Sequence, residues 1–326
     1  MENTFSIRSD LLIIILLLTL VSGCASKKDY EINPVPVYTE IVKIDSFYTV
    51  TEYIKTGKGD SLFCGIKGIF DSYSLLLFDT IPENYDSIFI RLKSDSANLT
   101  LYFYEVIDEW FEDSLYTWED ISWLIDTTQL IQSSLVDTIN PLIKLNDQTL
   151  NSIDEYGIAI YSDSFYSFAS RQKFQPRLKI YIGDSTYNRS CISDLYIVKN
   201  PYDSLLKDTL LVGRGINIKS NLFIPLDSLP LNRENIARAE LLFEIEESFP
   251  FDIVAYDILG DIFYGIDYTK GDTNFIRFNL WTLIQSDSLE EYNKIEIDAL
   301  NKLEGIDVKE FHRPELKLMW AEISIK

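Results

Sequence analysis

Few residues in this chain are suited to catalysis or metal binding. The 326 residues include one histidine, His312, and three cysteines, so multi-histidine metal sites are excluded and a nucleophile–histidine triad is disfavoured. The 51 acidic residues could supply carboxylate pairs for glycoside hydrolysis, but no flanking motif singles out two of them. A structural calcium ion stays open, although no Asp-x-Asp-x-Asp-Gly loop is present to name its ligands. The sequence therefore predicts a protein that is not an enzyme and has no cofactor.

Aromatic residues are the remaining candidates for a binding site. Trp110 and Trp118 offer flat apolar faces on which sugar rings can stack, but large aromatic side chains also pack in cores with the indole N–H hydrogen-bonded. Tyr102 and Tyr104 lie on one face of an expected strand, because side chains alternate along a strand. Phe165 and Tyr166 lie in an aromatic-rich loop segment, 161–168. These six residues form the predicted ligand-binding set.

The charge of the chain restricts its partners. The formal net charge is −22, from 29 basic and 51 acidic residues. A duplex nucleic acid needs a basic surface, so nucleic acid is excluded as a partner. The same charge disfavours adhesion to anionic lipid headgroups and favours a neutral glycan over an acidic one. Hydrophobic residues make up 46% of the chain, enough for a sizeable core.

The N-terminus has the pattern of a bacterial lipoprotein signal peptide. The apolar run at 11–21 is too short to span a bilayer and is typical of a signal-peptide core. It ends in Leu20-Val21-Ser22-Gly23-Cys24, which resembles a lipobox. The resemblance implies a signal peptide over 1–23 and acyl chains on Cys24, which give stable membrane anchoring. Ala25 and Ser26 follow the cysteine, and this resembles lipoproteins sent to the outer membrane of the bacterial cell envelope.

Beyond the signal peptide, the sequence predicts a tether and then many short strands. Residues 24–57 are assigned to the lipidated cysteine and the tether, although alternating apolar residues at 40–54 are also consistent with a first strand or its approach. Helical periodicity is scarce and is best near Trp281–Ser286. Strand signals rich in β-branched and aromatic residues occur at 75–78, 87–92, 99–106, 156–161 and 177–182. This pattern predicts an all-β protein.

The chain also contains an internal repeat. Ile81-Pro82 and Ile88 recur as Leu229-Pro230 and Ile236, with Pro82 and Ile88 each displaced by 148 positions. Both halves end alike, in a Pro-x-Leu-Lys segment after Gln175 and after Arg313. We therefore predict two tandem antiparallel β-sandwich domains over 58–183 and 190–326, joined by a linker near 183–189.

The ordered motifs of the first half resemble the DNRLRE family of extracellular bacterial domains, which look like carbohydrate-binding modules. The residues that carry the resemblance are Leu75-Leu76-Leu77-Phe78-Asp79, Ile81-Pro82, Leu101–Val106, Trp110, Thr117-Trp118, Tyr156–Ile160, Phe168–Arg171 and Pro176-Arg177-Leu178. The second half resembles the opening of the family pattern but is degenerate, with Ile262 and Lys270 where Trp110 and Trp118 stand. The resemblance implies jelly-roll-type sandwiches that bind polysaccharide.

Two functional hypotheses follow from these features. The first is a lipid-anchored lipoprotein that binds polysaccharide through its β-sandwich modules without cleaving it. The alternative is a structural spacer or adhesin component of the cell envelope whose partner is another protein. The pairing of Cys64 with Cys191 stays open, because the two residues lie far apart in a sequence without a disulfide framework.

Overall fold

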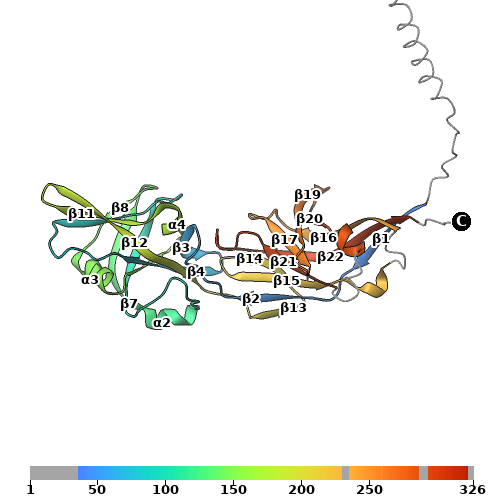
Figure 1. The fold of residues 1–326 in the computed structure, drawn as a ribbon, viewed down its shortest axis with the longest axis horizontal. Helices are drawn as coiled ribbons and strands as arrows, with labels where there is room; N and C mark the ends of the chain where they lie inside the picture. Colours follow the sequence, from blue (N-terminus) through green and yellow to red (C-terminus); the bar gives the residue numbers. More distant parts are fainter. Residues whose placement is uncertain (1–35, 230–234, 258, 286–292, 322–326) are drawn as a thin grey trace, which may run out of the picture.

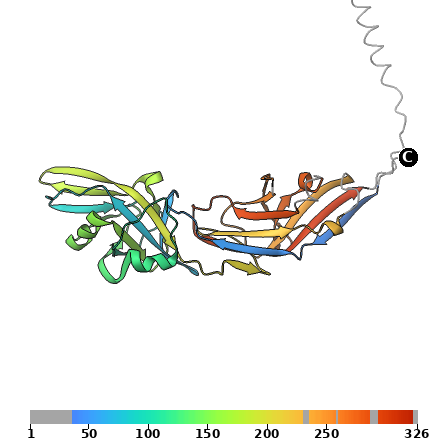
Figure 2. The same ribbon diagram turned by 60° about the horizontal axis from the view of Figure 1, so that its bottom comes forward.

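A computed structural model describes residues 36–229, 235–257, 259–285 and 293–321 of the chain. These residues form two antiparallel β-sandwich domains arranged end to end (Figures 1 and 2). The fold is all-β, as the sequence predicts. The expected signal peptide, the Cys24 anchor and the first part of the tether lie outside the described residues. No helix within the described ranges is long and apolar enough to span a membrane.

The N-terminal domain is a ten-stranded arrangement with the order β7-β6-β9-β4-β12-β11-β5-β8, in which β3 pairs with β4 and β10 pairs with β3. Its strands are β3 (Ser61–Lys67), β4 (Phe70–Phe78), β5 (Ser87–Arg91), β6 (Leu99–Val106), β7 (Ile125–Val136), β8 (Leu142–Lys144), β9 (Ile158–Ser162), β10 (Tyr166–Ala169), β11 (Arg177–Ile182) and β12 (Ser185–Val198). Short helices connect them: η1 (Trp118–Asp120), α2 (Ile121–Leu124), α3 (Asp147–Glu155) and α4 (Arg171–Phe174). The predicted strand signals all fall within these strands or overlap them by most of their length.

The C-terminal domain is a twelve-stranded arrangement with the order β18-β17-β21-β15-β14-β22-β16-β20-β19. Its strands are β1 (Val37–Lys43), β2 (Phe47–Glu52), β13 (Leu205–Lys207), β14 (Leu210–Arg214), β15 (Asn217–Phe223), β16 (Ile236–Ile245), β17 (Ile253–Asp257), β18 (Ile262–Tyr264), β19 (Ile266–Lys270), β20 (Thr273–Asn279), β21 (Lys294–Ala299) and β22 (Asp307–Ala321). Its helices are η2 (Leu226–Ser228) and α5 (Trp281–Gln285), the latter at the predicted helix.

Strand pairing repeats in the two domains. In the N-terminal domain β4 lies between β9 and β12, and β9 also pairs with β6; in the C-terminal domain β15 lies between β21 and β2, and β21 also pairs with β17. On the other layer β5 pairs with β8 and β11, as β16 pairs with β20 and β22. The internal repeat in the sequence thus has a counterpart in the order of the strands.

The first two strands belong to the C-terminal domain, although they precede the N-terminal domain in the chain. β1 pairs over its full length with β22, from Val37 opposite Ala321 to Lys43 opposite Glu315, and β2 pairs with β15 and β13. We call residues 37–52 the strap. The sequence assigns them to the tether, because alternation over so short a segment does not show which sheet a strand joins. Val42 and Ile44 are buried in the C-terminal core.

The boundary between the domains also differs from the prediction. Residues 183–184, expected in a linker, form the turn of the β11–β12 hairpin, with Gly183 in the left-handed region at φ +54°. β12 then continues to Val198 as part of the N-terminal domain. The domains are therefore connected twice, by residues 53–60 and by residues 199–204.

An apolar junction holds the two domains together. Leu211, Ile216 and Ile306 of the C-terminal domain are buried in one hydrophobic cluster with core residues of the N-terminal domain. Beside it, Asp307 accepts from Lys67 Nζ at 2.6 Å and from Arg214 Nη2 at 2.8 Å. Apolar burial combined with a partly buried ion-pair network favours a fixed arrangement of the two domains. The described chain begins and ends at the pole farthest from the N-terminal domain (Figure 2).

Candidate functional site

Several tyrosines lie on the outer face of the N-terminal domain, on three neighbouring strands. β6 turns Leu101 and Phe103 into the core and leaves Tyr102 and Tyr104 on the opposite face. β9 places Tyr161 directly opposite Tyr102, since these two residues are register partners. β4, on the other side of β9, adds Tyr73 to this face. We call Tyr73, Tyr102, Tyr104, Tyr161 and the adjoining Trp118 the aromatic face.

The rings of the aromatic face are arranged around Tyr73. Tyr161 stacks on Tyr73 with centroids 4.7 Å apart, Trp118 lies at 5.8 Å and Tyr104 meets Tyr73 edge-on at 6.0 Å. All four side chains are half-buried, so each keeps part of its surface in solvent. Partial burial raises the pKa of Tyr73 to about 12 and also raises those of Tyr104 and Tyr161, so the hydroxyls stay neutral. The result is a preformed platform of apolar rings with neutral hydroxyl groups.

Two carboxylates and one ammonium group border this platform. The Tyr102 hydroxyl donates a hydrogen bond of 2.5 Å to exposed Asp163, and Asp71 lies next to the Tyr161 hydroxyl. Burial raises the pKa of Asp71, and Oδ1 of that residue is buried without a hydrogen-bond partner. Lys199 places its ammonium group 5.9 Å from the Trp118 ring. The platform thus combines ring faces with hydrogen-bonding groups that could orient a hydroxyl-rich ligand.

A loop built from η1 and α2 positions Trp118 and covers the rest of the same sheet face. Thr117 and Asp120 form a capping box in which the Asp120 carboxylate accepts from the backbone N–H of Thr117 at 2.6 Å. Ile121 and Leu124 then bury against Leu75 of β4 in a small separate core. The contacts of Ile121 and Leu124 with the sheet hold the loop in place. The loop does not cover the part of the face that carries Tyr102, Tyr104 and Tyr161.

The predicted ligand-binding residues divide between this face and the interior. Tyr102, Tyr104 and Trp118 lie on the aromatic face. Trp110 is only 4% exposed, and its indole N–H donates to the Tyr156 carbonyl at 2.8 Å, so it is a core residue and not a stacking platform. Tyr166 is fully buried on β10, so its prediction as a ligand-binding residue of a loop is wrong.

Phe165 is half-buried at the junction. Its ring stacks on Phe63 at 5.7 Å, and the Lys67 ammonium group lies 4.7 Å from its centroid. It therefore packs beside the interdomain ion pair and is separate from the aromatic face.

Sequence reasoning missed Tyr73 and Tyr161. In the sequence, Tyr161 begins an aromatic-rich segment, and Tyr73 directly precedes an apolar run that is typical of a core strand. Alternation along each strand could have assigned both to a face. No local signal could have shown that β4 and β6 both neighbour β9, because that order depends on long-range pairing.

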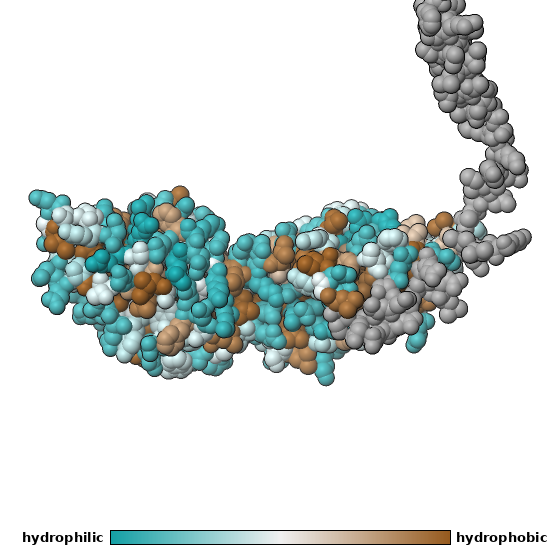
Figure 3. Space-filling model, in the orientation of Figure 1, coloured by the Kyte–Doolittle hydropathy of each residue, from teal (hydrophilic) through white to brown (hydrophobic). Residues whose placement is uncertain are grey.

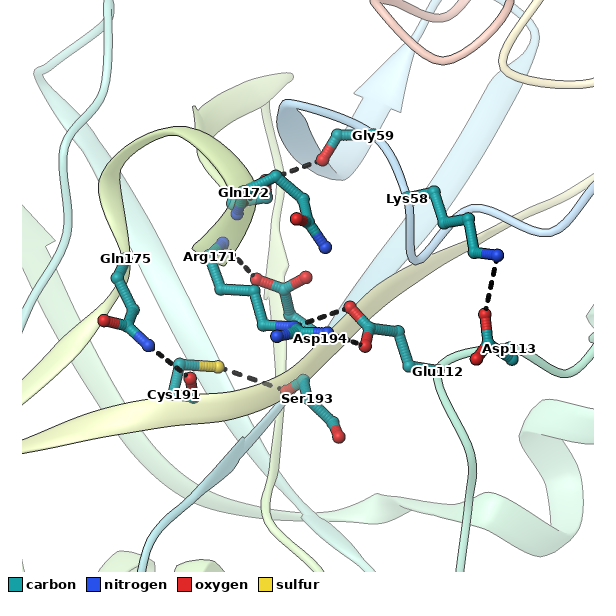
Figure 4. Close-up of polar contacts among 11 residues, drawn as sticks. Lys58, Gly59, Glu112, Asp113, Arg171, Gln172, Gln175, Cys191, Ser193 and Asp194 are labelled. Carbon is teal, nitrogen blue, oxygen red and sulfur yellow. Dashed lines mark hydrogen bonds and ion pairs between the residues drawn. The ribbon is translucent and has the colours of Figure 1, made fainter.

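A partly buried charged cluster surrounds Asp194 of β12, beside residues Lys58 and Gly59 of the 53–60 connection (Figure 4). Arg171 forms a bidentate ion pair with Glu112, and its backbone N–H donates to Asp194 at 2.5 Å. Asp194 is fully buried, and burial raises the pKa of its carboxyl to about 7, with a further contribution from Glu112. Gly57 passes so close to Glu112 that a Cβ atom would collide with it. This closeness indicates a structural cluster sealed by the 53–60 connection.

Cys64 and Cys191 are both free and buried, and burial raises the pKa of each thiol well above its usual range. Neither thiol is therefore poised as a nucleophile. His312 lines an open cavity of about 540 Å³ in the C-terminal domain, with its Nδ1 3.9 Å from Glu310. Among the described residues, no group of three or more His, Cys, Asp or Glu side chains could hold a metal ion.

Comparisons with known proteins do not assign the chain to a family. No family model matches it, and no curated protein matches it. One solved structure, the C-terminal domain of the Streptococcus pyogenes antigen I/II-family protein AspA, aligns over 89% of this chain and 92% of its own. The identity is 10% and the TM-score is 0.13, which is too low to indicate a shared fold.

Proposed function

We propose that this protein is a membrane-anchored, extracytoplasmic lipoprotein that binds a polysaccharide on the aromatic face of its N-terminal domain and does not cleave it. The observation that carries the proposal is the grouping of Tyr73, Tyr104, Tyr161 and Trp118 into one partly open platform. Pyranose rings present flat C–H surfaces that suit such rings, while their hydroxyl groups suit Asp71 and Asp163. The lipobox-like segment ending in Cys24 supports the anchoring.

The shape of the molecule is consistent with this role. The described chain starts with β1 at one pole, and the N-terminal domain lies at the other (Figure 1). An anchor at Cys24 would therefore hold the C-terminal domain near the membrane and present the N-terminal domain away from it. Most of the surface is hydrophilic in Figure 3, with apolar side chains in scattered patches, as suits a body held in water.

The test is affinity electrophoresis of the mature chain through gels that contain neutral or acidic polysaccharides. We expect retardation by a neutral glycan. Replacing Tyr104 or Tyr161 by Ala removes one ring of the platform and should weaken binding by about 1–2 kcal/mol, or roughly 5- to 30-fold. Y187A is the matched control, because Tyr187 is 48% exposed on β12, away from the platform. Equal retention of all three variants, or no retention of the parent chain by any glycan, contradicts the proposal.

A spacer that binds another envelope protein is the second candidate. The apolar junction with its Lys67–Asp307 ion pair favours it, because a fixed two-domain body can hold a partner at a set distance from the membrane. Crosslinking in cells separates the two functions: one dominant protein partner without glycan retention supports the spacer.

A further inference from the structure

The strap occupies a position that the N-terminal domain fills from its own chain. In that domain β12 pairs with β11 through its first half and with β4 through its second half. In the C-terminal domain the two strands of the strap make the equivalent pairings, because β1 pairs with β22 and β2 pairs with β15. β12 follows β11 directly through a two-residue turn, whereas the strap is separated from the rest of its domain by the whole N-terminal domain.

The C-terminal domain is incomplete without this segment. Val42 and Ile44 contribute to its apolar core, and Thr49 bonds through its hydroxyl to Ser220 and to the carbonyl of Thr209. Thr51 donates its backbone N–H to the Ser204 carbonyl at 3.0 Å. Removing the strap would expose these apolar side chains and leave strand edges unpaired on β22 and β15, which is a surface that another strand can occupy.

The contacts that hold the strap and the N-terminal domain against the C-terminal domain join residues 36–198 to residues 199–321. These include the strap pairings, the buried cluster around Ile216 and Ile306, and the ion pair of Lys67 with Asp307. The covalent connection between the two parts is only the segment 199–204. A second copy of the chain could therefore supply its residues 36–198 to the same C-terminal domain and reproduce these contacts. The hydrogen bonds that Thr51 forms with residues 200, 203 and 204 of the connecting segment itself would change.

We propose that copies of this chain exchange their 36–198 units, forming dimers in which each C-terminal domain is completed by the strap of the other copy. The closed and exchanged forms differ only at the 199–204 hinge and in the entropy of association. Exchange therefore becomes favourable where the concentration of copies approaches the effective concentration of the tethered unit, on the order of 1 mM. Copies anchored at the N-terminus, next to the strap, would be concentrated in this way. The inference does not depend on glycan binding.

The test uses a disulfide that reports which chain supplies the strap. Thr39 and Met319 are directly opposite in the β1–β22 ladder, so a T39C/M319C variant can form a cross-strand disulfide. Within a closed monomer the bond links one chain to itself, and in an exchanged dimer it links two chains covalently. Two differently tagged samples of the variant are mixed and unfolded in urea. They are then refolded at protein concentrations of about 0.01 mM and about 1 mM and oxidised.

We expect disulfide-linked heterodimers on a non-reducing gel, increasing with protein concentration, and linked monomers at the lower concentration. T269C/N274C is the control, because these register partners lie in the β19–β20 hairpin and can only link within one unit. If T39C/M319C gives only linked monomers at both concentrations, or no more heterodimer than the control, the exchange proposal is wrong. Monomer linkage also verifies that the variant folds with the strap in register.

Discussion

The buried carboxyl of Asp194 should make the stability of the N-terminal domain depend on pH in an unusual direction. Burial raises its pKa in the fold to about 7, against about 3.9 for an unfolded aspartate. Between these values the folded state holds a proton that the unfolded state releases, so the free energy of unfolding decreases as pH rises. Three pKa units at 1.36 kcal/mol each give a loss of about 4 kcal/mol by pH 8.

The substitution Asp194→Asn removes this titration and keeps an oxygen that can accept from the backbone N–H of Arg171. The amide N–H groups of the new asparagine are buried without acceptors. They lower the free energy of unfolding of the variant by about 1–3 kcal/mol at every pH. The decisive quantity is therefore how the difference in the free energy of unfolding between the variant and the parent chain changes with pH. We expect this difference to shift by about 4 kcal/mol between about pH 4 and pH 8, in favour of the variant at high pH.

Urea unfolding followed by tryptophan fluorescence at several pH values measures this shift. Trp110, Trp118 and Trp123 report on the N-terminal domain. D184N is the control, because Asp184 is exposed in the β11–β12 turn and should leave the pH profile of the parent chain unchanged. If the profiles of D194N and the parent chain run parallel within about 1 kcal/mol, burial does not hold the Asp194 carboxyl protonated and the reasoning fails.

Three further outcomes follow from the packing. Trp110→Phe should cost the N-terminal domain about 1 kcal/mol in urea unfolding through loss of the indole hydrogen bond, with glycan retention unchanged, since Trp110 is in the core. Val42→Asp puts an unpaired carboxylate into the C-terminal core, so limited proteolysis with mass spectrometry should show cleavage of residues 199–321 while residues 61–198 resist. Asp307→Asn removes the acceptor charge for Lys67 and Arg214 and should cost about 2 kcal/mol, with a broader distribution of domain orientations in small-angle scattering; an unchanged scattering profile would show that the apolar cluster alone fixes the junction.

The sequence predicts those residues of the aromatic face whose orientation depends on a single strand. Tyr102 and Tyr104 alternate with Leu101 and Phe103, and this period of two places them on the face away from the core. The same reasoning cannot separate Trp118 from Trp110, because both are tryptophans in one loop and their burial depends on what the loop packs against. Trp110 faces the carbonyl of Tyr156, far along the chain, and becomes core.

Local composition and periodicity determine the class of this fold. Short runs of β-branched and aromatic residues between turns indicate strands, because these signals come from residues close in sequence. The recurrence of the same short motifs in both halves of the chain indicates two similar units. The tertiary structure alone decides which strands are neighbours. It brings Tyr73 and Tyr161 into one aromatic face, extends β12 beyond the expected linker, and assigns the strap to the C-terminal domain. These outcomes depend on hydrogen bonds and apolar contacts between segments far apart in the chain, such as Val37 and Ala321, and no local pattern of residues encodes which distant edge a strand will join.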